Sequence, residues 1–362
     1  EIKRPPGFSS VDIESIEDFI GTNLKEANLP SDVEYTPVDA GQMMSKKLSG
    51  EKDKEVPYIH SSNIIGDDGK PIDLTTLKNL ITVKPDHILE RNEKIKHSGG
   101  KTWIFYNISL PAYKGLFYDE ADGVFKIINV CRNAGACKVY CYARQGGYIQ
   151  WKASSLKSTR TVNFLFNHWD DFKNKVVSEI TEAYNKNKQK DVTTVIRWHD
   201  SGDFVSGKYL DMAYDIARAT PEVIHYAYTK MVELVSKSNI PKNFVFNFSV
   251  GGTQDTLVDP KIQKHSKVVP SKYFTGLITQ YMDGKIKKYK FNSQESYNEF
   301  KKIMSDRYDI PEDTIITYEE LMKMPYNRNQ DYTPKWNVIV YTGDGDDAAA
   351  RKDVLGVYLL IH

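Results

Sequence analysis

A chain of 362 residues is too long for one small module and fits either two domains or one elaborated α/β barrel. Its hydrophobic fraction of 40% excludes disorder of the whole chain, while 27% charged residues and a mean hydropathy of −0.52 are atypical of a membrane protein. The formal net charge of +1 excludes a global basic field of the kind that attracts nucleic acid or anionic membranes, so any such surface has to be local.

Residues 1–100 are predicted to form an irregular N-terminal extension, because proline and glycine punctuate only short apolar runs there. The start of the chain, EIKRPPGFSS, has no apolar segment of the kind that marks a secretion signal. No apolar run in the sequence reaches the roughly 20 residues that a membrane-spanning helix needs. We therefore expect a cytoplasmic protein without a membrane partner.

Residues 101–362 are predicted to form a β/α core domain. The apolar, aromatic run WIFYNISL at 103–110 opens it, and the β-branched run FKIINV at 125–130 predicts a buried strand that ends at Cys131. Residues 154–188 then predict one long helix, because apolar side chains recur at steps of three and four. These are Val162, Leu165, Phe166, Trp169, Phe172, Val176, Ile180 and Tyr184.

Strands and helices alternate after that helix. Residues 191–200, 222–230 and 243–252 are predicted strands, and residues 206–220 and 231–238 are predicted helices. This β-α-β-α-β order argues for a parallel sheet, so the predicted fold class is α/β, as a partial or complete β/α (TIM-like) barrel.

The pattern is less regular from residue 252 to 330. It predicts a strand near 267–274 and helices near 293–307 and 317–324. The lysine-rich segment 284–290, GKIKKYK, is either a solvated face or a contact for phosphates. A strand, a helix and a strand then follow in 336–362.

All three cysteines lie on a loop at 131–141, with the spacing C-x5-C-x3-C. Three soft thiolates on one loop can converge on a metal centre. A structural zinc ion would need a fourth ligand, for which His168 and His199 are candidates. An iron–sulfur cluster held by three thiolates would keep one iron open for a substrate or cofactor. The cysteines could also be buried thiols without a metal.

A strand, a three-cysteine loop with Tyr140 directly before Cys141, a helix and repeated β/α units resemble the radical S-adenosylmethionine superfamily. The string CKVYCYA is also similar to loops of related uncharacterised phage proteins. The resemblance implies a [4Fe–4S] cluster on Cys131, Cys137 and Cys141, with S-adenosylmethionine on the open iron. It further implies an external electron donor, a 5′-deoxyadenosyl radical and, for a phage protein, the host cytoplasm. The superfamily commonly spaces its cysteines C-x3-C-x2-C, so this loop is longer.

Polar residues end the predicted strands, where functional groups gather in parallel α/β folds. In RWHDSGD at 197–203, the SGD string resembles the superfamily's short motif for the methionyl amine, with Asp203 in the acidic place. A bland alternative is a turn that caps the next helix. The resemblance implies that the cofactor contacts are Tyr140, Ser201, Gly202, Asp203 and Ser249.

The string GDGDDA at 343–348 matches a loose dinucleotide fingerprint, but its carboxylates would repel a pyrophosphate and favour a helix cap. The substrate is unidentified; a nucleotide or nucleic acid is one class consistent with the phage resemblance. Two other functions stay open. One is a non-catalytic binding module with a structural Cys3His zinc site, and the other is a metal-dependent hydrolase built from His199, Asp200, Asp203 and His225.

Overall fold

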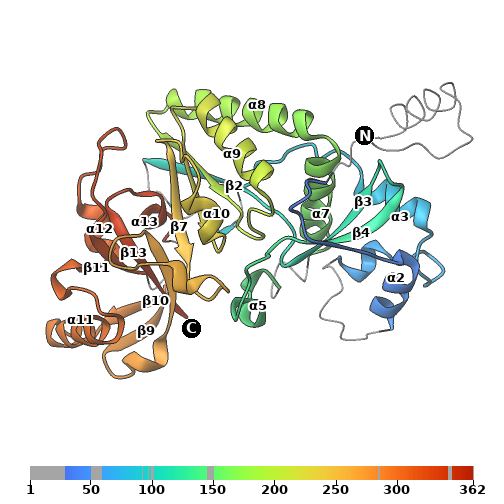
Figure 1. Cartoon of the computed structure of the whole chain (residues 1–362). Helices are drawn as coiled ribbons and strands as arrows, with labels where there is room; N and C mark the ends of the chain where they lie inside the picture. Colours follow the sequence, from blue (N-terminus) through green and yellow to red (C-terminus); the bar gives the residue numbers. More distant parts are fainter. Residues whose placement is uncertain are drawn as a thin grey trace, which may run out of the picture.

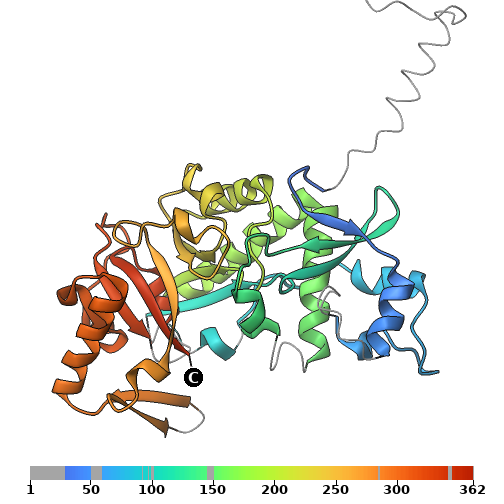
Figure 2. The same ribbon diagram turned by 60° about the horizontal axis from the view of Figure 1, so that its bottom comes forward.

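The computed structural model describes residues 29–49, 59–91, 93–96, 98, 102–144, 151–283, 286–340 and 345–361. Within them lie an eight-stranded parallel sheet, a three-stranded antiparallel sheet and a two-stranded hairpin. Figure 1 and Figure 2 both place the antiparallel sheet at one end of the molecule and the hairpin at the other. The parallel sheet lies between them.

The parallel sheet has the strand order β11-β12-β13-β8-β7-β6-β5-β2. The five strands that come first along the chain lie side by side in chain order, from β2 at one edge to β8, which agrees with the predicted β/α alternation. Their bounds are β2 Trp103–Ile108, β5 Thr193–Trp198, β6 Ile224–Thr229, β7 Phe244–Ser249 and β8 His265–Pro270. The last three are β11 Ile315–Thr317, β12 Trp336–Val340 and β13 Val354–Ile361.

The parallel sheet does not form a complete barrel. After β8 the chain crosses to β11 and returns inward through β12 to β13, which pairs with β8. Strands β2 and β11 therefore stay at opposite edges and do not pair, although a closed barrel requires its first and last strands to meet. The observed fold is an open α/β sheet.

Helices cover both faces of this sheet because the direction of strand addition reverses. One face packs against α8 Trp169–Lys188, α9 Gly207–Ala219 and α10 Val232–Ser236. Helix α7, Lys152–Asn167, belongs to the same apolar core and packs against α8 and the antiparallel sheet. Further along the same face lies α11, Gln294–Tyr308. The other face packs against α4 Glu93–Lys96, α12 Tyr318–Lys323 and α13 Asp346–Ala350.

The predicted long helix is in fact two helices, α7 and α8, which meet at His168. The His168 backbone leaves the helical region there, with φ −140° and ψ 63°. The Asn167 side chain donates to the carbonyl of Tyr118 over 2.9 Å and accepts from the amide of Glu120 over 3.2 Å. The break thus lets Asn167 hold the end of a strand in the antiparallel sheet.

The antiparallel sheet contains the strand that leads to Cys131. It consists of β1 Tyr35–Pro37, β4 Val124–Asn129 and β3 Lys114–Asp119, in that order. Helices α2 Ala40–Leu48 and α3 Leu74–Ile81 pack their apolar side chains against it. The predicted strand before Cys131 is confirmed, but it lies outside the parallel sheet. The region expected to be irregular thus supplies a strand and helices.

The remaining elements are short connections and a hairpin. They are η1 Ser61–Asn63, α5 Cys137–Tyr140, η2 Tyr142–Arg144, η3 Asp255–Leu257, η4 Ser271–Phe274, β9 Ile278–Asp283, β10 Ile286–Phe291 and η5 Glu312–Thr314. The lysine-rich segment forms part of the β9–β10 hairpin, and Gly284 and Lys285 lie outside the described residues. Gly343 of the GDGDDA string also lies outside them.

Candidate functional site: a cysteine loop at the carboxyl edge of the sheet

The cysteine loop lies against the carboxyl ends of β6 and β7, where sequence reasoning expected strand-end residues to gather. The Cys137 amide donates to the Gly251 carbonyl over 3.2 Å, and the Thr253 amide donates to the Asn133 carbonyl over 2.9 Å. Figure 1 shows α5, which begins at Cys137, beneath α10 and β7. The structure therefore brings all three cysteines to the edge of the parallel sheet.

Two glycines allow the loop and the sheet edge to touch through their backbones. A Cβ atom on Gly252 would lie 2.8 Å from the carbonyl oxygen of Asn133. One on Gly135 would lie 2.9 Å from the carbonyl oxygen of Gly251. The Asp255 carboxylate accepts from the amides of Gly251 and Gly252, over 2.8 and 2.9 Å. The docking contact is thus held from both sides.

The three thiols are free, partly buried and close enough to influence one another. Burial raises the pKa of Cys131, the charges of Asp203 and the other two thiols add to it, and a hydrogen bond from the Tyr113 backbone opposes it. Burial also raises the pKa of Cys137, against the opposing positive charge of Lys230. A bound cation would favour the thiolate forms.

The donor set that the loop offers a metal centre consists of three thiols. Within the described ranges, no three His, Cys, Asp or Glu side chains are grouped so that they could hold one metal ion. Three thiolates from one loop are ligands that iron–sulfur clusters take.

A chain of polar contacts joins three strand ends beside the loop. The Asp203 carboxylate, which follows β5, accepts from the Thr229 hydroxyl over 2.6 Å and from the Lys230 amide over 2.8 Å. Burial raises the pKa of Asp203, while these donors oppose the rise. The Lys230 ammonium donates to the Ser249 hydroxyl over 2.7 Å. Asp203, Lys230 and Ser249 therefore share the edge that carries the cysteines.

Other predicted contacts have internal partners. The Ser201 hydroxyl donates to the Leu110 carbonyl. Gly202 has φ +87°, and a Cβ atom on it would lie 2.7 Å from Leu110 Cβ, so the close approach that this glycine permits is to Leu110. The cap of α9 is Ser206, not a residue of the SGD string. Tyr140 ends α5, and its side chain lies outside the described part of the chain.

The three histidines that the sequence offered as metal ligands have other partners. His168 Nε2 lies 3.6 Å from a Glu120 carboxylate oxygen. His199 Nε2 lies 2.8 Å from the Tyr209 hydroxyl. His225 accepts from the Trp198 indole over 3.1 Å, and burial lowers the pKa of His225 to about 3, as it does for His199. No histidine joins the cysteines in a metal-binding group among the residues that the structure describes.

Sequence reasoning missed a buried ion pair between β5 and α13. Arg197 and Asp346 meet at 2.8 Å, with side chains 5% and 3% exposed. The N-cap residue of α13 is Gly345, so no side chain caps the helix; Asp346 and Asp347 lie in its first turn, where negative charge is favourable. The two partners are 149 positions apart, so no local sequence signal could have paired them.

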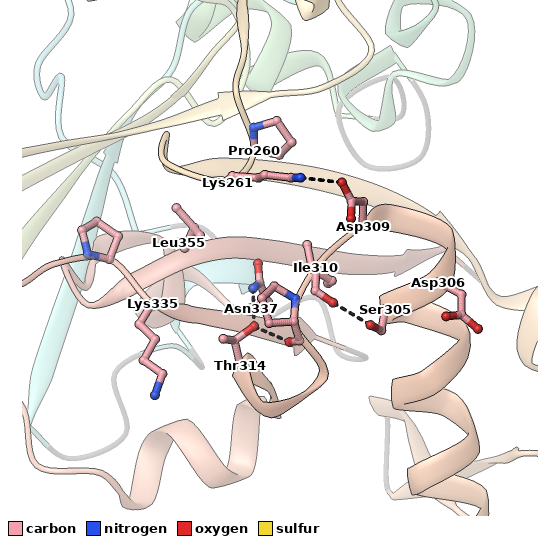
Figure 3. A pocket seen from close by; sticks show the side chains of 12 residues that line it. Pro260, Lys261, Ser305, Asp306, Asp309, Ile310, Thr314, Lys335, Asn337 and Leu355 are labelled. Carbon is pink, nitrogen blue, oxygen red and sulfur yellow. Dashed lines mark hydrogen bonds and ion pairs between the residues drawn. The ribbon is translucent and has the colours of Figure 1, made fainter.

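A cavity of about 700 Å³ lies at the other end of the parallel strands. Figure 3 shows Asn337 near its centre, donating to the Thr314 hydroxyl, and Lys261 paired with Asp309. Asn337 and Leu355 are the second residues of β12 and β13, so the cavity opens at the amino edge. It is therefore separate from the cysteine loop.

The family model described as Gene product 88 matches residues 85–313, more than half of the chain. The match includes the cysteine loop and strands β2 to β8. No curated protein and no solved structure matches the sequence. Among the described helices, none is both long enough and apolar enough to cross a membrane.

Proposed function

The chain belongs to the phage-type Gene product 88 family, and we propose that it is an iron–sulfur enzyme of the radical S-adenosylmethionine type. Cys131, Cys137 and Cys141 would hold a [4Fe–4S] cluster. The observation that carries this proposal is the docking of a three-thiol loop on the carboxyl edge of a parallel sheet. Ligands of open α/β sheets bind at that edge.

The chemistry that such a centre supplies with bound S-adenosylmethionine is one-electron cleavage of the sulfonium, with the electron coming from an external donor. The protein's own residues would favour the thiolate form of a cysteine and fix the strand ends at this edge. Lys230 places a positive charge near Cys137 and favours its thiolate form. Asp203 ties the ends of β5 and β6 together through Thr229 and Lys230.

Five residues are the proposed contacts for the cofactor. Ser249 and Asp203 are polar groups at the same edge as the thiols, which supports them most directly. Ser201 and Gly202 adjoin Asp203 in the chain, and Tyr140 directly precedes Cys141. A reducing interior such as the host cytoplasm would keep the three thiols available.

Anaerobic reconstitution with iron and sulfide tests the proposal, with iron, sulfide and zinc analysis and an ultraviolet–visible spectrum. We expect about four irons and four sulfides per chain, lost in Cys137→Ala and kept in the control His225→Gln. Reduction with dithionite in the presence of S-adenosylmethionine should then yield 5′-deoxyadenosine. Stoichiometric zinc without sulfide would overturn the proposal and favour a structural zinc module.

A further inference from the structure

Three cationic side chains surround the ring of Tyr113, next to the cysteine loop. The Lys114 ammonium lies 5.5 Å from the ring centroid, the Lys138 ammonium 6.0 Å and the Arg144 guanidinium 5.5 Å. All are within the range of cation–π attraction. We call these four residues the Tyr113 cluster.

The cluster concentrates positive charge in a molecule whose net charge is only +1. Neither Lys138 nor Arg144 forms an ion pair with a carboxylate of the described residues. The Arg144 guanidinium instead donates to the Lys138 carbonyl over 3.2 Å, which fixes it beside the other cation. Like charges held together repel each other, so a bound anion would be stabilised here.

The Tyr113 backbone is held in a conformation that few residues adopt. Its φ is +67°, which is uncommon for any residue except glycine. The Tyr113 carbonyl accepts from the Val130 amide over 2.9 Å. Strain of this kind persists where the surrounding structure enforces it, and it is concentrated at functional sites.

The Tyr113 cluster lies next to the thiols, through the hydrogen bond from Val130 and through neighbours in the chain. Val130 directly precedes Cys131, Lys138 directly follows Cys137, and Arg144 is three positions after Cys141. Val139, beside Lys138, exposes 81% of its surface and adds an apolar contact at the same loop. An anion bound here would therefore lie next to the proposed reaction centre.

We propose that the Tyr113 cluster docks a single-stranded nucleic acid, which is the substrate class of the proposed enzyme. Phosphates would bind Lys114, Lys138 and Arg144, and a base would lie against the Tyr113 ring and Val139. Cations combined with an aromatic ring are the means by which proteins bind single strands without reading their sequence. A single strand also presents its bases unstacked, as chemistry on a base requires. This inference deepens the proposed function. Only the role of the nucleic acid as a substrate rests on that function; the docking surface itself does not.

Fluorescence anisotropy with a labelled single-stranded DNA 20-mer tests the docking surface on the full chain, at several salt concentrations. We expect Lys138→Gln/Arg144→Gln to weaken binding at least tenfold. The slope of log affinity against log salt should fall by about 1.4, because two phosphate contacts are lost. The matched control is Lys186→Gln/Lys190→Gln, which removes two exposed charges at the end of α8 and should bind like the parent.

Equal binding by the parent and the Lys138→Gln/Arg144→Gln protein would overturn the inference, as would no binding by the parent. Equally tight, cluster-dependent binding of poly-L-glutamate would assign the surface to an acidic protein instead. Anisotropy reports DNA binding whatever the iron content of the chain, so the two measurements are independent. Failure of the iron analysis would thus overturn the proposed function alone, and failure of DNA binding would overturn the docking surface alone.

Discussion

Replacing Gly252 with alanine should push the cysteine loop away from the sheet edge. The added Cβ atom would lie 2.8 Å from the Asn133 carbonyl oxygen, about 0.6 Å short of the 3.4 Å at which ordinary contact begins. The other near atoms are Cβ and Cδ of Lys230, both at 3.2 Å, so that side chain would have to move too. Overpacking of this kind costs about 1–3 kcal/mol.

Two measurements on Gly252→Ala check this reasoning. Urea unfolding should show the lost stability, and iodoacetamide should alkylate Cys137 faster than in the parent, because the Cys137 amide bonds to Gly251 beside the substitution. Gly207→Ala is the matched control, since its nearest foreign atom would lie at an ordinary 3.7 Å. If both alanine variants keep the parent's stability and alkylation rate, the close contact between loop and edge is refuted.

Three further substitutions test the interior. Asp346→Asn removes the carboxylate that pairs with the buried Arg197 and should cost about 3–5 kcal/mol by urea unfolding, part of which the added Arg197→Met should restore. His225 has a folded-state pKa of about 3, so below about pH 6.5 only the unfolded chain takes up its proton and stability falls with falling pH. His225→Gln should therefore lower the dependence of stability on pH by about 1.4 kcal/mol per pH unit. Urea unfolding at pH 6 and at pH 4 measures this change. Gly202→Ala, strained by φ +87° and by Leu110 at 2.7 Å, should lower the unfolding midpoint; an unchanged midpoint would contradict the packing described.

Local sequence patterns predicted most elements of the parallel sheet. The strands at β5, β6 and β7 follow from buried β-branched and aromatic runs, and helices with one apolar face separate them. Patterns of this kind report which side chains are buried. They do not report which strand pairs with which. Local patterns could therefore not predict the reversal of strand order that leaves the sheet open, nor the antiparallel pairing of β1 with β4.

The candidate site also has parts that local sequence predicted and parts that it did not. Polar strand ends predicted that Asp203 and Ser249 would share one edge, since parallel strands end on the same side. Cys131 reaches that edge in another way, because its strand β4 belongs to the antiparallel sheet and the loop after it docks on Gly251 and Thr253. The role of Lys230 and the cations around Tyr113 depend on contacts between distant segments. The periodicity of 154–188 also concealed a break at His168, because both helices face the same core.

The place of β13 has a consequence for how the protein forms during synthesis. In the parallel sheet β13 lies between β8 and β12, yet it is translated after the other seven strands. The earlier strands of this sheet, β2, β5, β6, β7 and β8, can pair one after another as they leave the ribosome, because each is a neighbour of the one before it in this series. Strands β11 and β12 share no pairing with them until β13 arrives. The two halves of the sheet thus become one only when the last strand is inserted.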